Sequence, residues 1–378
     1  MKALGVGLIG CGNISKAYLQ LGPQFGGFEI RAVADIDAVA AKSRATEFGV
    51  RAMTVEELLN AADIDVVVNL TIPSAHFEVS AAILEAGKHV YSEKPLVLTL
   101  EEGAELRRRA ERAGLRVGCA PDTFLGGAHQ QVRALIDEGA IGKVVSGTAH
   151  VMGRGMEHWH PNPDFFFRRG AGPVLDVGPY YITNLIQLLG PVARVGSMST
   201  SATPTRTILS DPRKGEVIPV ETPTTIHALL EFASGAIVTL GASWDVQAHR
   251  HAHLELYGTK GSLFAPDPNF FGGQPEIAGP DGTIRPVDPW DHPLGRPNVQ
   301  PDSATPRANY RTAGLADMIA AIRENRAHRC ALELALHAVD AMTSILRSGE
   351  SGAFMELSTT CERPAPLNPR AAEELLRS

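Results

Sequence analysis

The chain has 378 residues, of which 44% are hydrophobic and 20% are charged, enough for two domains with their own cores. A formal net charge of −7 argues against nucleic acid or an anionic membrane surface as the partner, because both attract basic patches. No apolar stretch reaches the length of a membrane span, and the sequence opens with a strand-like run rather than a signal peptide. Four widely spaced cysteines, in no metal-ligand spacing, indicate reduced thiols, so we expect a cytoplasmic protein.

The first predicted element is a short apolar strand that enters a glycine-rich turn and then a helix. Gly10 allows the sharp turn, and Gly12 leaves no side chain between the main chain and a pyrophosphate. The amides of the turn and of the helix start, around Asn13 and Ile14, would bind that anion. Ser15 replaces the third glycine of the usual dinucleotide fingerprint and is small enough to keep helix and strand close.

The second predicted strand, residues 28–35, ends in an acid. Asp35 lies about 20 residues beyond Gly12, where a carboxylate accepts hydrogen bonds from the ribose hydroxyls of a dinucleotide. This carboxylate would repel a 2′-phosphate, and no arginine follows it directly, so the sequence favours NAD over NADP as the cofactor. The alternative is that Asp35 only caps the next helix.

Strands and helices continue to alternate as far as Pro121. The hydrophobic pattern predicts helices over 38–48, 55–62, 74–86 and 100–113, and strands over 65–70, 89–92 and 115–119. This succession with short connections is typical of a parallel, doubly wound sheet covered on both faces. We therefore expect an α/β protein with an NAD-binding Rossmann domain over residues 1–121.

Beyond about residue 150 the pattern changes to long β-rich stretches, at 144–152, 192–201, 224–232, 236–246 and 253–257. They predict an open, mostly antiparallel sheet. Residues 265–306 hold ten of the 26 prolines and must be extended or looped, and helices return over 315–323 and 332–346. We expect residues 122–378 to form an α+β domain that binds substrate and, through its sheet, makes a homodimer or homotetramer.

Ligands of an open parallel sheet bind beyond the carboxyl ends of its strands. Two polar segments at such ends are candidates for cofactor contact: Thr71, Pro73 and His76 after one strand, and Glu93 and Lys94 after the next. Residues 120–125 form a third segment of this kind. The fixed positive charge of Lys94 would polarise a substrate oxygen, unless Lys94 is a solvated lysine paired with Glu93.

Three runs carry a resemblance to a known family: Gly10-Cys11-Gly12, Glu93-Lys94-Pro95, and Gly-Pro-Val-Leu-Asp-Val-Gly-Pro-Tyr-Tyr over residues 172–181. Through them the chain resembles, over nearly its whole length, the glucose–fructose oxidoreductase / inositol dehydrogenase / MocA family of NAD(P)-dependent sugar and polyol dehydrogenases. The resemblance implies an amino-terminal Rossmann domain and a carboxyl-terminal domain whose open sheet often forms an oligomer interface. It also implies that the lysine of Glu-Lys-Pro lies in the catalytic cleft.

The third run departs from the pattern of many members, Asp-x-Gly-x-His-x-x-Asp, in which the histidine is the base. Asp176 and Gly178 match it, but Tyr180 stands at the histidine position and Thr183 at the second acid. The chain is closer to a branch with Asp-x-Gly-Pro-Tyr-Tyr, so the histidine base is not carried over.

Tyr180 is the candidate replacement for that base. A phenol is a poor base at neutral pH, but an adjacent ammonium such as Lys94 stabilises the phenolate. Tyr180 would then remove a hydroxyl proton as hydride leaves the same carbon. Asp176, one helical turn earlier, and Asn184, one turn later, would bind neighbouring hydroxyls. The alternative is that Tyr180 packs in the core and Asp176 caps the helix.

The loop at 156–165 mixes aromatic and polar groups, as carbohydrate sites do. Trp159 or Phe165 would cover a sugar face, while His158, His160 and Asn162 would bind hydroxyls. His160 is also a rival candidate for the base. The alternative is a surface loop with aromatic anchors.

His249, His251 and His253 alternate along a predicted strand and so share one face. No carboxylate or cysteine accompanies them in ligand-like spacing, so we expect no metal site. They are expected at an interface or in the substrate cleft.

The sequence therefore predicts an NAD-dependent dehydrogenase that oxidises a secondary alcohol of a sugar or polyol, or reduces the matching ketone. One alternative is an enzyme that keeps NAD bound and uses transient oxidation for isomerisation or glycoside cleavage. Another is a non-catalytic NAD-binding regulator on the same fold, which the presence of Lys94 disfavours.

Overall fold

A computed structural model describes residues 3–300 and 306–377 of the chain. Its contacts divide the chain into two compact units. Unit 1 comprises Met1–Gly127, Asp291–Val339 and Pro364–Ser378, and unit 2 comprises Ala128–Trp290 and Asp340–Arg363. This division differs from a single boundary at residue 121, because two later segments return to the amino-terminal unit.

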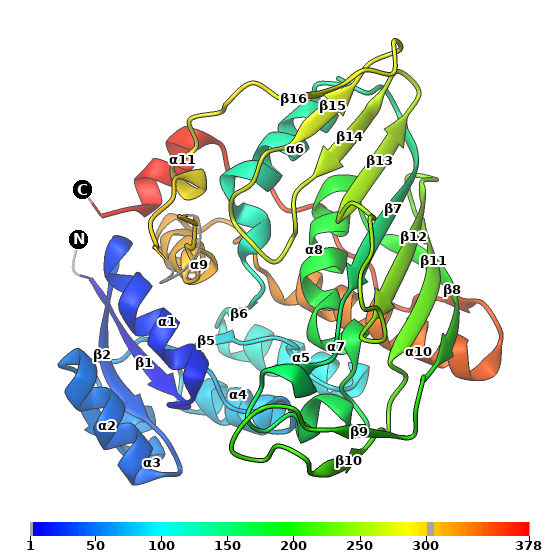
Figure 1. Cartoon of the computed structure of the whole chain (residues 1–378). Helices are drawn as coiled ribbons and strands as arrows, with labels where there is room; N and C mark the ends of the chain where they lie inside the picture. The colour runs from blue at the N-terminus through cyan, green and yellow to red at the C-terminus, as the bar shows by residue number, and fades with distance from the viewer. Residues whose placement is uncertain (1–2, 301–305, 378) are drawn as a thin grey trace. The chain divides into compact units, whose positions relative to one another are not determined.

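Unit 1 contains a six-stranded parallel sheet in the order β3-β2-β1-β4-β5-β6 (Figure 1). From β1 the chain moves outward first through β2 and β3, and then in the opposite direction through β4, β5 and β6. Right-handed crossovers therefore place helices on both faces of the sheet. The predicted doubly wound sheet is confirmed. The strands are β1 Leu4–Ile9, β2 Phe28–Ala34, β3 Arg51–Met53, β4 Val66–Asn69, β5 His89–Ser92 and β6 Val117–Cys119.

Three of the five crossover helices begin at a side-chain cap, whereas α1 and α4 do not. Asp37 caps α2, and threonine–glutamate capping boxes begin α3 and α5. By contrast, α1 follows Gly12, which has no side chain with which to cap it. The amides of Asn13 and Ile14 are therefore left for another acceptor, while that of Ser15 donates to the Gly12 carbonyl oxygen. The helices are α1 Asn13–Leu21, α2 Ala38–Phe48, α3 Val55–Asn60, α4 His76–Glu85 and α5 Leu100–Ala113.

The later segments of unit 1 are mostly helical. Helix α9 packs against β6, and α11 packs against α9. An isolated bridge joins Leu376, just after α11, to Phe25 near the start of the chain. Residues close to the end of the sequence therefore contact the amino-terminal part of unit 1. The bounds are α9 Ala313–Glu324, α10 Leu332–Ser351, which runs from unit 1 into unit 2, and α11 Pro369–Leu375.

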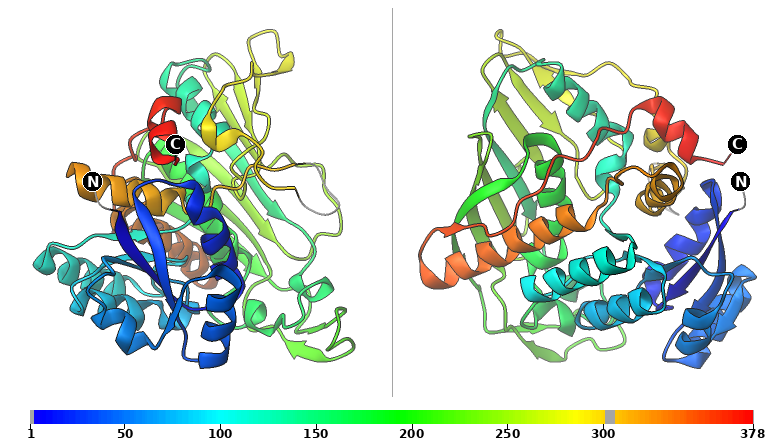
Figure 2. Two further views of the ribbon diagram at one scale, coloured as in Figure 1. Left: turned by 90° about the vertical axis from the view of Figure 1, so that its left-hand side faces the viewer. Right: turned by 180° about the vertical axis from the view of Figure 1, so that it is seen from behind.

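Unit 2 is built on a nine-stranded sheet in the order β16-β15-β14-β13-β7-β12-β11-β8-β17 (Figures 1 and 2). Every neighbouring pair is antiparallel except β7 and β12, which are parallel. The predicted open, mostly antiparallel sheet is confirmed. The strands are β7 Val144–Met152, β8 Val192–Thr200, β11 Thr225–Phe232, β12 Ile237–Ser243, β13 Leu254–Gly258, β14 Ser262–Ala265, β15 Glu276–Ala278, β16 Ile284–Pro286 and β17 Met355–Glu356.

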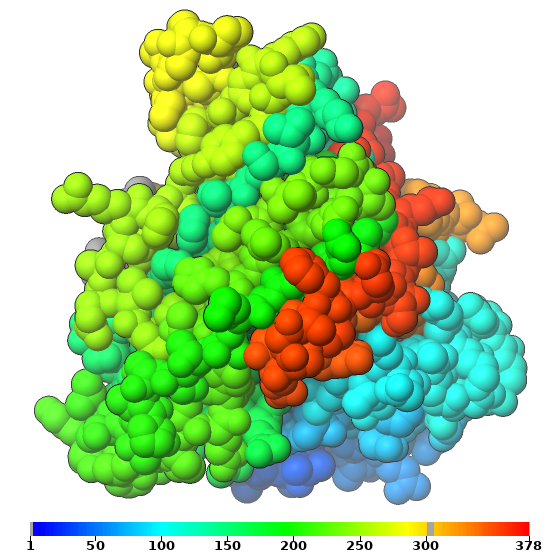
Figure 3. Space-filling model, turned by 90° about the vertical axis from the view of Figure 1, so that its right-hand side faces the viewer, coloured from blue at the N-terminus to red at the C-terminus, as the bar shows by residue number. Residues whose placement is uncertain are grey.

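One face of this sheet is buried and the other is open. Along β11, Ile226, Ala228 and Leu230 are buried, while His227 and Leu229 point to the opposite face, in keeping with the period of two. Helix α8, Gly178–Leu189, lies on the buried side, and Figure 3 shows the broad open side. The remaining elements are α6 Gly127–Asp137, α7 Pro173–Asp176, and a hairpin of β9 Thr205–Thr207 and β10 Val217–Pro219.

Two further properties bear on the expectations above. No helix within residues 3–300 and 306–377 is long and apolar enough to cross a membrane. All four cysteines are free thiols.

Candidate active site

The glycine-rich turn after β1 has the predicted shape. Gly10 has φ of +105°, and a Cβ there would lie 2.6 Å from the carbonyl carbon of Leu70. A Cβ at Gly12 would meet no atom within 4 Å. Buried Ser15 donates from its hydroxyl to the Gly12 carbonyl oxygen at 2.6 Å. Gly10 is thus required by the backbone, whereas Gly12 leaves open space above the start of α1.

Asp35 places its carboxylate against this turn. One oxygen accepts the Cys11 amide at 2.7 Å, and the other accepts the Asp37 amide at 2.9 Å. The cap of α2 is Asp37, so the alternative that Asp35 only caps that helix does not hold. Burial, reinforced by the charge of Asp35, raises the pKa of the Cys11 thiol to about 11. The thiol therefore stays neutral beside the turn.

Arg44 on α2 was missed by sequence reasoning. Its Nη2 lies 3.3 Å from the Gly12 carbonyl oxygen and 3.5 Å from that of Cys11, and its Nη1 donates to Glu47 at 2.6 Å. The guanidinium is therefore occupied by backbone carbonyls and a carboxylate, which fits a turn that binds NAD better than one that binds a 2′-phosphate. Sequence reasoning considered only an arginine directly after Asp35, whereas Arg44 lies within the helix that follows, α2.

The loop after β4 is tied to the loop after β5 by His76. Its ring is buried, with Nδ1 2.6 Å from the Pro95 carbonyl oxygen and Nε2 3.0 Å from that of Thr71. Thr71 is held in turn by buried Asn69, whose side-chain oxygen accepts its amide and hydroxyl. His76 therefore joins two loops rather than presenting its ring to a cofactor. Pro73, in contrast, is exposed.

Glu93 and Lys94 follow β5, and the structure separates their roles. Glu93 accepts the hydroxyl of buried Tyr18 at 3.0 Å and the backbone amide of Lys94 at 3.1 Å. Lys94 is half-buried rather than fully exposed. Burial, then the charge of Glu93, raises the pKa of Tyr18 well above its usual value, so Tyr18 remains a hydrogen-bond donor.

Asp122, in the third polar segment, is buried and holds the start of α9. Its Oδ2 accepts the amides of Thr312 and Gly314, both at 3.0 Å. Thr312 has φ of +98°, a conformation that costs energy in any residue with a Cβ. Burial raises the pKa of Asp122 to about 6, although the two amide bonds oppose this.

In unit 2, Asp176 is the last residue of α7 and Tyr180 lies in the first turn of α8. Both are half-buried, and the position deep in the core belongs to Tyr181 instead. The residue at the start of α8 is Val177, so Asp176 does not cap that helix. The two alternatives to a site role, core packing and capping, therefore do not hold for this pair.

Asn184 does not lie where the sequence predicted it. It is fully buried, with its side-chain nitrogen 3.3 Å from His129 Nδ1 and its oxygen accepting Gln187 at 3.0 Å. The helical period correctly placed Asn184 one turn after Tyr180 on the same side of α8. At that turn, however, the helix is already buried by the rest of unit 2. Its amide is satisfied inside unit 2 and is not offered to substrate.

The aromatic loop both anchors itself and exposes rings. Phe167 is buried in a small core with Trp244, while Trp159 and Phe165 are exposed. The His160 ring packs edge-on against Trp159 and Phe165, with ring centroids 5.3 Å and 5.5 Å apart, respectively. The loop therefore matches the anchored alternative and still presents aromatic surface.

The polar residues of this loop fall into two places. His160 Nδ1 accepts the Asn162 amide at 3.1 Å, which keeps this pair with the exposed rings. His158 points elsewhere, with Nδ1 3.1 Å from Arg154 and its ring near buried Glu157. The structure thus groups His160, Asn162 and Phe165, and leaves His158 apart.

The three alternating histidines do not share a strand, because β13 begins only at Leu254. The His251 ring stacks on His150 at 4.0 Å and lies 6.2 Å from His249. His253 instead contacts Tyr181. Among residues 3–300 and 306–377, no group of three histidine, cysteine, aspartate or glutamate side chains is placed to hold a metal ion.

Two family models match the chain, one within each unit. Residues 4–120 match the oxidoreductase family with an NAD-binding Rossmann fold. Residues 129–264 match the GFO/IDH/MocA C-terminal domain.

The chain is also similar to characterised sugar-converting enzymes. It is 31% identical over 267 residues to dTDP-3,4-didehydro-2,6-dideoxy-alpha-D-glucose 3-reductase from Saccharopolyspora spinosa, covering 69% of this chain and 74% of that protein. It is 28% identical over 268 residues to 1,5-anhydro-D-fructose reductase from Ensifer adhaerens, covering 68% and 74%. Its fold is similar to that of a levoglucosan dehydrogenase solved with NADH, with a TM-score of 0.80, 21% identity, and coverage of 95% and 100%.

Proposed function

The chain belongs to the GFO/IDH/MocA oxidoreductase family, with an NAD-binding Rossmann domain, and on that premise we propose that it oxidises a secondary alcohol of a sugar or polyol, or reduces the matching ketone. The observation that carries this proposal is the pairing of the open turn at Gly12 with the Asp35 carboxylate, at the same sheet edge as half-buried Lys94.

The residues of unit 1 fit a dinucleotide. The amides at Gly12, Asn13 and Ile14 lie at the start of an uncapped helix, where a Cβ at Gly12 would meet no atom, and this favours a diphosphate. Asp35 has lone pairs left for ribose hydroxyls, and fully exposed Ile36 offers apolar surface to the adenine ring. When bound, NAD supplies the hydride acceptor of the reaction.

We assign to Lys94 the polarisation of the reacting substrate oxygen. The carboxylate beside it in sequence, Glu93, is engaged by Tyr18 and by a backbone amide. A fixed cation stabilises the negative charge that develops on an oxygen losing its proton. Replacement by a neutral side chain removes that stabilisation without touching the glycine-rich turn.

We assign to Tyr180 the removal of the hydroxyl proton, and to Asp176 a hydrogen bond with a neighbouring hydroxyl. Both are half-buried, Asp176 at the end of α7 and Tyr180 in the first turn of α8. Helix capping and core packing do not account for them. In the oxidation, the hydroxyl proton passes to Tyr180 while the carbon gives up hydride. His160, Asn162 and Phe165 are proposed to line the sugar site, with His160 as the rival base.

The proposal is tested by mixing purified protein with NAD⁺ and a panel of sugars, sugar acids and inositols, and following NADH absorbance. Stoichiometric or catalytic NADH release supports a dehydrogenase. Conversion of a sugar without NADH release would identify an enzyme that keeps NAD bound. Binding of NAD⁺ with no turnover across the panel would identify a non-catalytic regulator and end the proposal.

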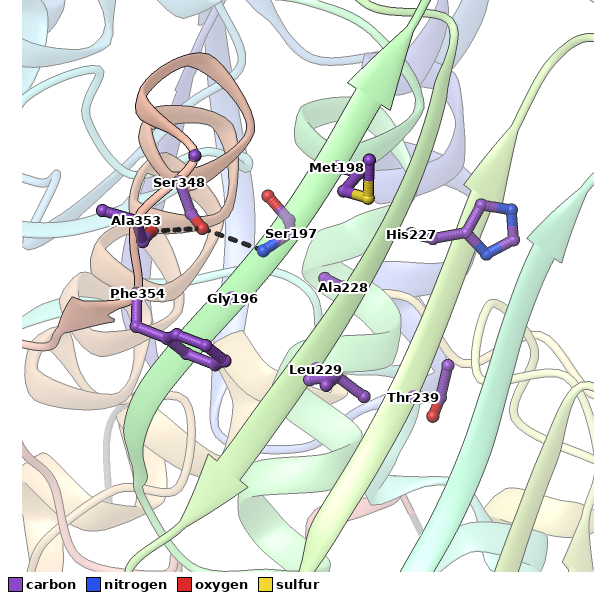
Figure 4. Close-up of a pocket in the computed structure, with 11 residues that line it drawn as sticks. Gly196, Ser197, Met198, His227, Ala228, Leu229, Thr239, Ser348, Ala353 and Phe354 are labelled. Carbon is purple, nitrogen blue, oxygen red and sulfur yellow. Dashed lines mark hydrogen bonds between the residues drawn. The ribbon is translucent and has the colours of Figure 1, made fainter.

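We further propose that the open face of the unit 2 sheet joins copies of this chain into a dimer or tetramer. Met198 on β8 is 81% exposed, and with Leu229 and Phe354 it borders a hollow of about 380 Å³ (Figure 4). Exposed apolar surface of this kind favours a protein partner. Met198→Lys should reduce the mass measured by light scattering, and an unchanged mass would contradict this interface.

We also propose a cytoplasmic location for the protein, which its free cysteines favour.

A further inference from the structure

Three polar side chains from distant parts of the sequence meet in unit 2. The Tyr181 hydroxyl, on α8, lies 2.9 Å from His253 Nδ1 and 3.1 Å from Asp267 Oδ1. His253 stands just before β13, and Asp267 just after β14. His253 Nδ1 and Asp267 Oδ2 are 3.9 Å apart. None of these three residues belongs to the set assigned above.

The hydrogen bonds determine which atom carries each proton. A carboxylate only accepts, so the single proton of the Tyr181 hydroxyl is donated to Asp267. The same oxygen, Oδ1, also accepts the Asn269 amide at 3.0 Å. The phenol oxygen is then free to accept, and the contact with His253 becomes an N–H donation from Nδ1. In the neutral ring this leaves Nε2 as an acceptor.

Burial separates the three members by role. Tyr181 is 2% exposed, and burial, followed by the charge of Asp267, raises its pKa well above the usual value. It is therefore a permanent neutral bridge and not a base. The His253 side chain is 47% exposed, so its ring reaches the surface of unit 2. Among the described residues, Nε2 of His253 and Oδ2 of Asp267 accept no hydrogen bond.

The cluster stands at the end of unit 2 that carries the proposed substrate residues. Tyr181 directly follows Tyr180 in the first turn of α8. The backbone of His253 pairs with that of His150 near the end of β7, and the aromatic loop continues from that strand. Two neighbouring acceptor atoms at such a place suit donors in pairs, which is what adjacent hydroxyls supply.

We propose that His253 and Asp267, held by Tyr181, form a subsite that accepts hydrogen bonds from two adjacent hydroxyls of a polyhydroxy substrate. The subsite rests on the proposed function, and it restricts the substrate class to vicinal diols rather than isolated secondary alcohols. His253 and Asp267 touch the substrate, whereas Tyr181 is a positioning residue that fixes the histidine tautomer.

The tautomer gives a test that needs no substrate. In ¹H–¹⁵N spectra of the histidine rings of the full-length protein, His253 should carry its proton on Nδ1. Tyr181→Phe, which keeps the ring and removes only the hydroxyl, should abolish that preference while thermal unfolding shows that the fold is retained. A proton on Nε2 in the wild-type protein would overturn the proposal.

Ligand binding gives the second test, by calorimetry of NAD⁺-loaded protein with D-glucose, D-xylose and myo-inositol. His253→Ala and Tyr181→Phe should each weaken the polyol by about tenfold or more, with NAD⁺ affinity unchanged. His251→Ala, two residues away and outside the cluster, should match the wild type. Equal polyol affinity in the wild type and both variants would overturn the subsite alone. If NAD⁺ binds the wild type and no polyol does, the sugar assignment falls and the subsite with it.

Discussion

The two places where ligand recognition is proposed are built in opposite ways. In unit 1 the glycine-rich turn uses consecutive residues, and its binding groups are main-chain amides. In unit 2 the cluster of Tyr181, His253 and Asp267 uses side chains that the fold brings together from α8 and from the ends of β13 and β14. A binding site made of consecutive residues can be recognised from their spacing in the sequence. One of the second kind exists only once the sheet has formed.

The most demanding test of this contrast asks whether each unit supplies one essential chemical group. Lys94→Ala in unit 1 and Tyr180→Phe in unit 2 should each reduce turnover by roughly 10²- to 10⁴-fold, the range for loss of an acid–base group. Calorimetry should show NAD⁺ binding unchanged in both. Tyr257→Phe, on the unit 2 sheet, is the matched control and should keep its activity. Near-normal turnover in Tyr180→Phe would shift the base to another residue such as His160.

The two glycines of the turn should separate folding from binding. Gly10→Ala places a Cβ against Leu70 at a positive φ, so we expect about 2–4 kcal/mol loss in the free energy of unfolding. Gly12→Ala meets no atom, so it should unfold at the wild-type temperature and yet bind NAD⁺ about tenfold more weakly. Full NAD⁺ affinity in Gly12→Ala would contradict the main-chain recognition of the diphosphate.

Asp122 should give unit 1 a pH-dependent stability. Its pKa is raised from 3.8 to about 6 in the folded state, so between these values the folded protein holds a proton that the unfolded chain has released. Raising the pH through this window should therefore cost about 3 kcal/mol of unfolding free energy.

Asp122→Asn is the informative comparison, because both amides donate to one carboxylate oxygen, which an asparagine carbonyl can replace. Urea unfolding at about pH 4 and about pH 7 should show the loss in the wild type and not in this variant. Parallel pH dependence in the two proteins would exclude Asp122 as its source.

The smallest effects are expected at the acids after β2. Asp35→Asn should weaken NAD⁺ by about tenfold and narrow its advantage over NADP⁺, because the ribose partner and the repulsion of a 2′-phosphate are both reduced. Asp37→Asn, which alters only the cap of α2, should cost at most about 1 kcal/mol and leave cofactor preference unchanged. Equal cofactor preference in both variants would argue that Asp35 does not face the ribose.

Local pattern predicted most of the strands and helices, but not β3, α6 or α11, and it failed where depth or long-range pairing decides. The period of 3.6 residues predicted that Asn184 lies on the same side of the helix as Tyr180. It does not predict which turns of the helix are exposed to solvent, and Asn184 is buried. Alternation suggested a strand through His249 to His253, yet strand β13 begins only at Leu254. Arg44 was invisible because its contacts with the turn depend on how α2 packs.

The division into units could not be predicted from a change in pattern along the chain. The boundary near residue 121 marks the end of the alternating strands and helices, whereas unit 1 also includes α9 and α11. The apolar periodicity of α9 shows that it is a helix and not which sheet it covers, and α11 was not predicted. Likewise, Thr71 and Lys94 were found from strand ends, but His76, which links their loops, was assigned to the cofactor because its burial has no local signature.

The hold of Asp122 on residues 312 and 314 has a consequence for synthesis of the chain on the ribosome. A nascent chain halted at residue 290 already contains the whole glycine-rich turn and Asp35. The Asp122 carboxylate of that chain still lacks both of its amide donors. The residues of the turn are therefore synthesised before the segment that donates to Asp122.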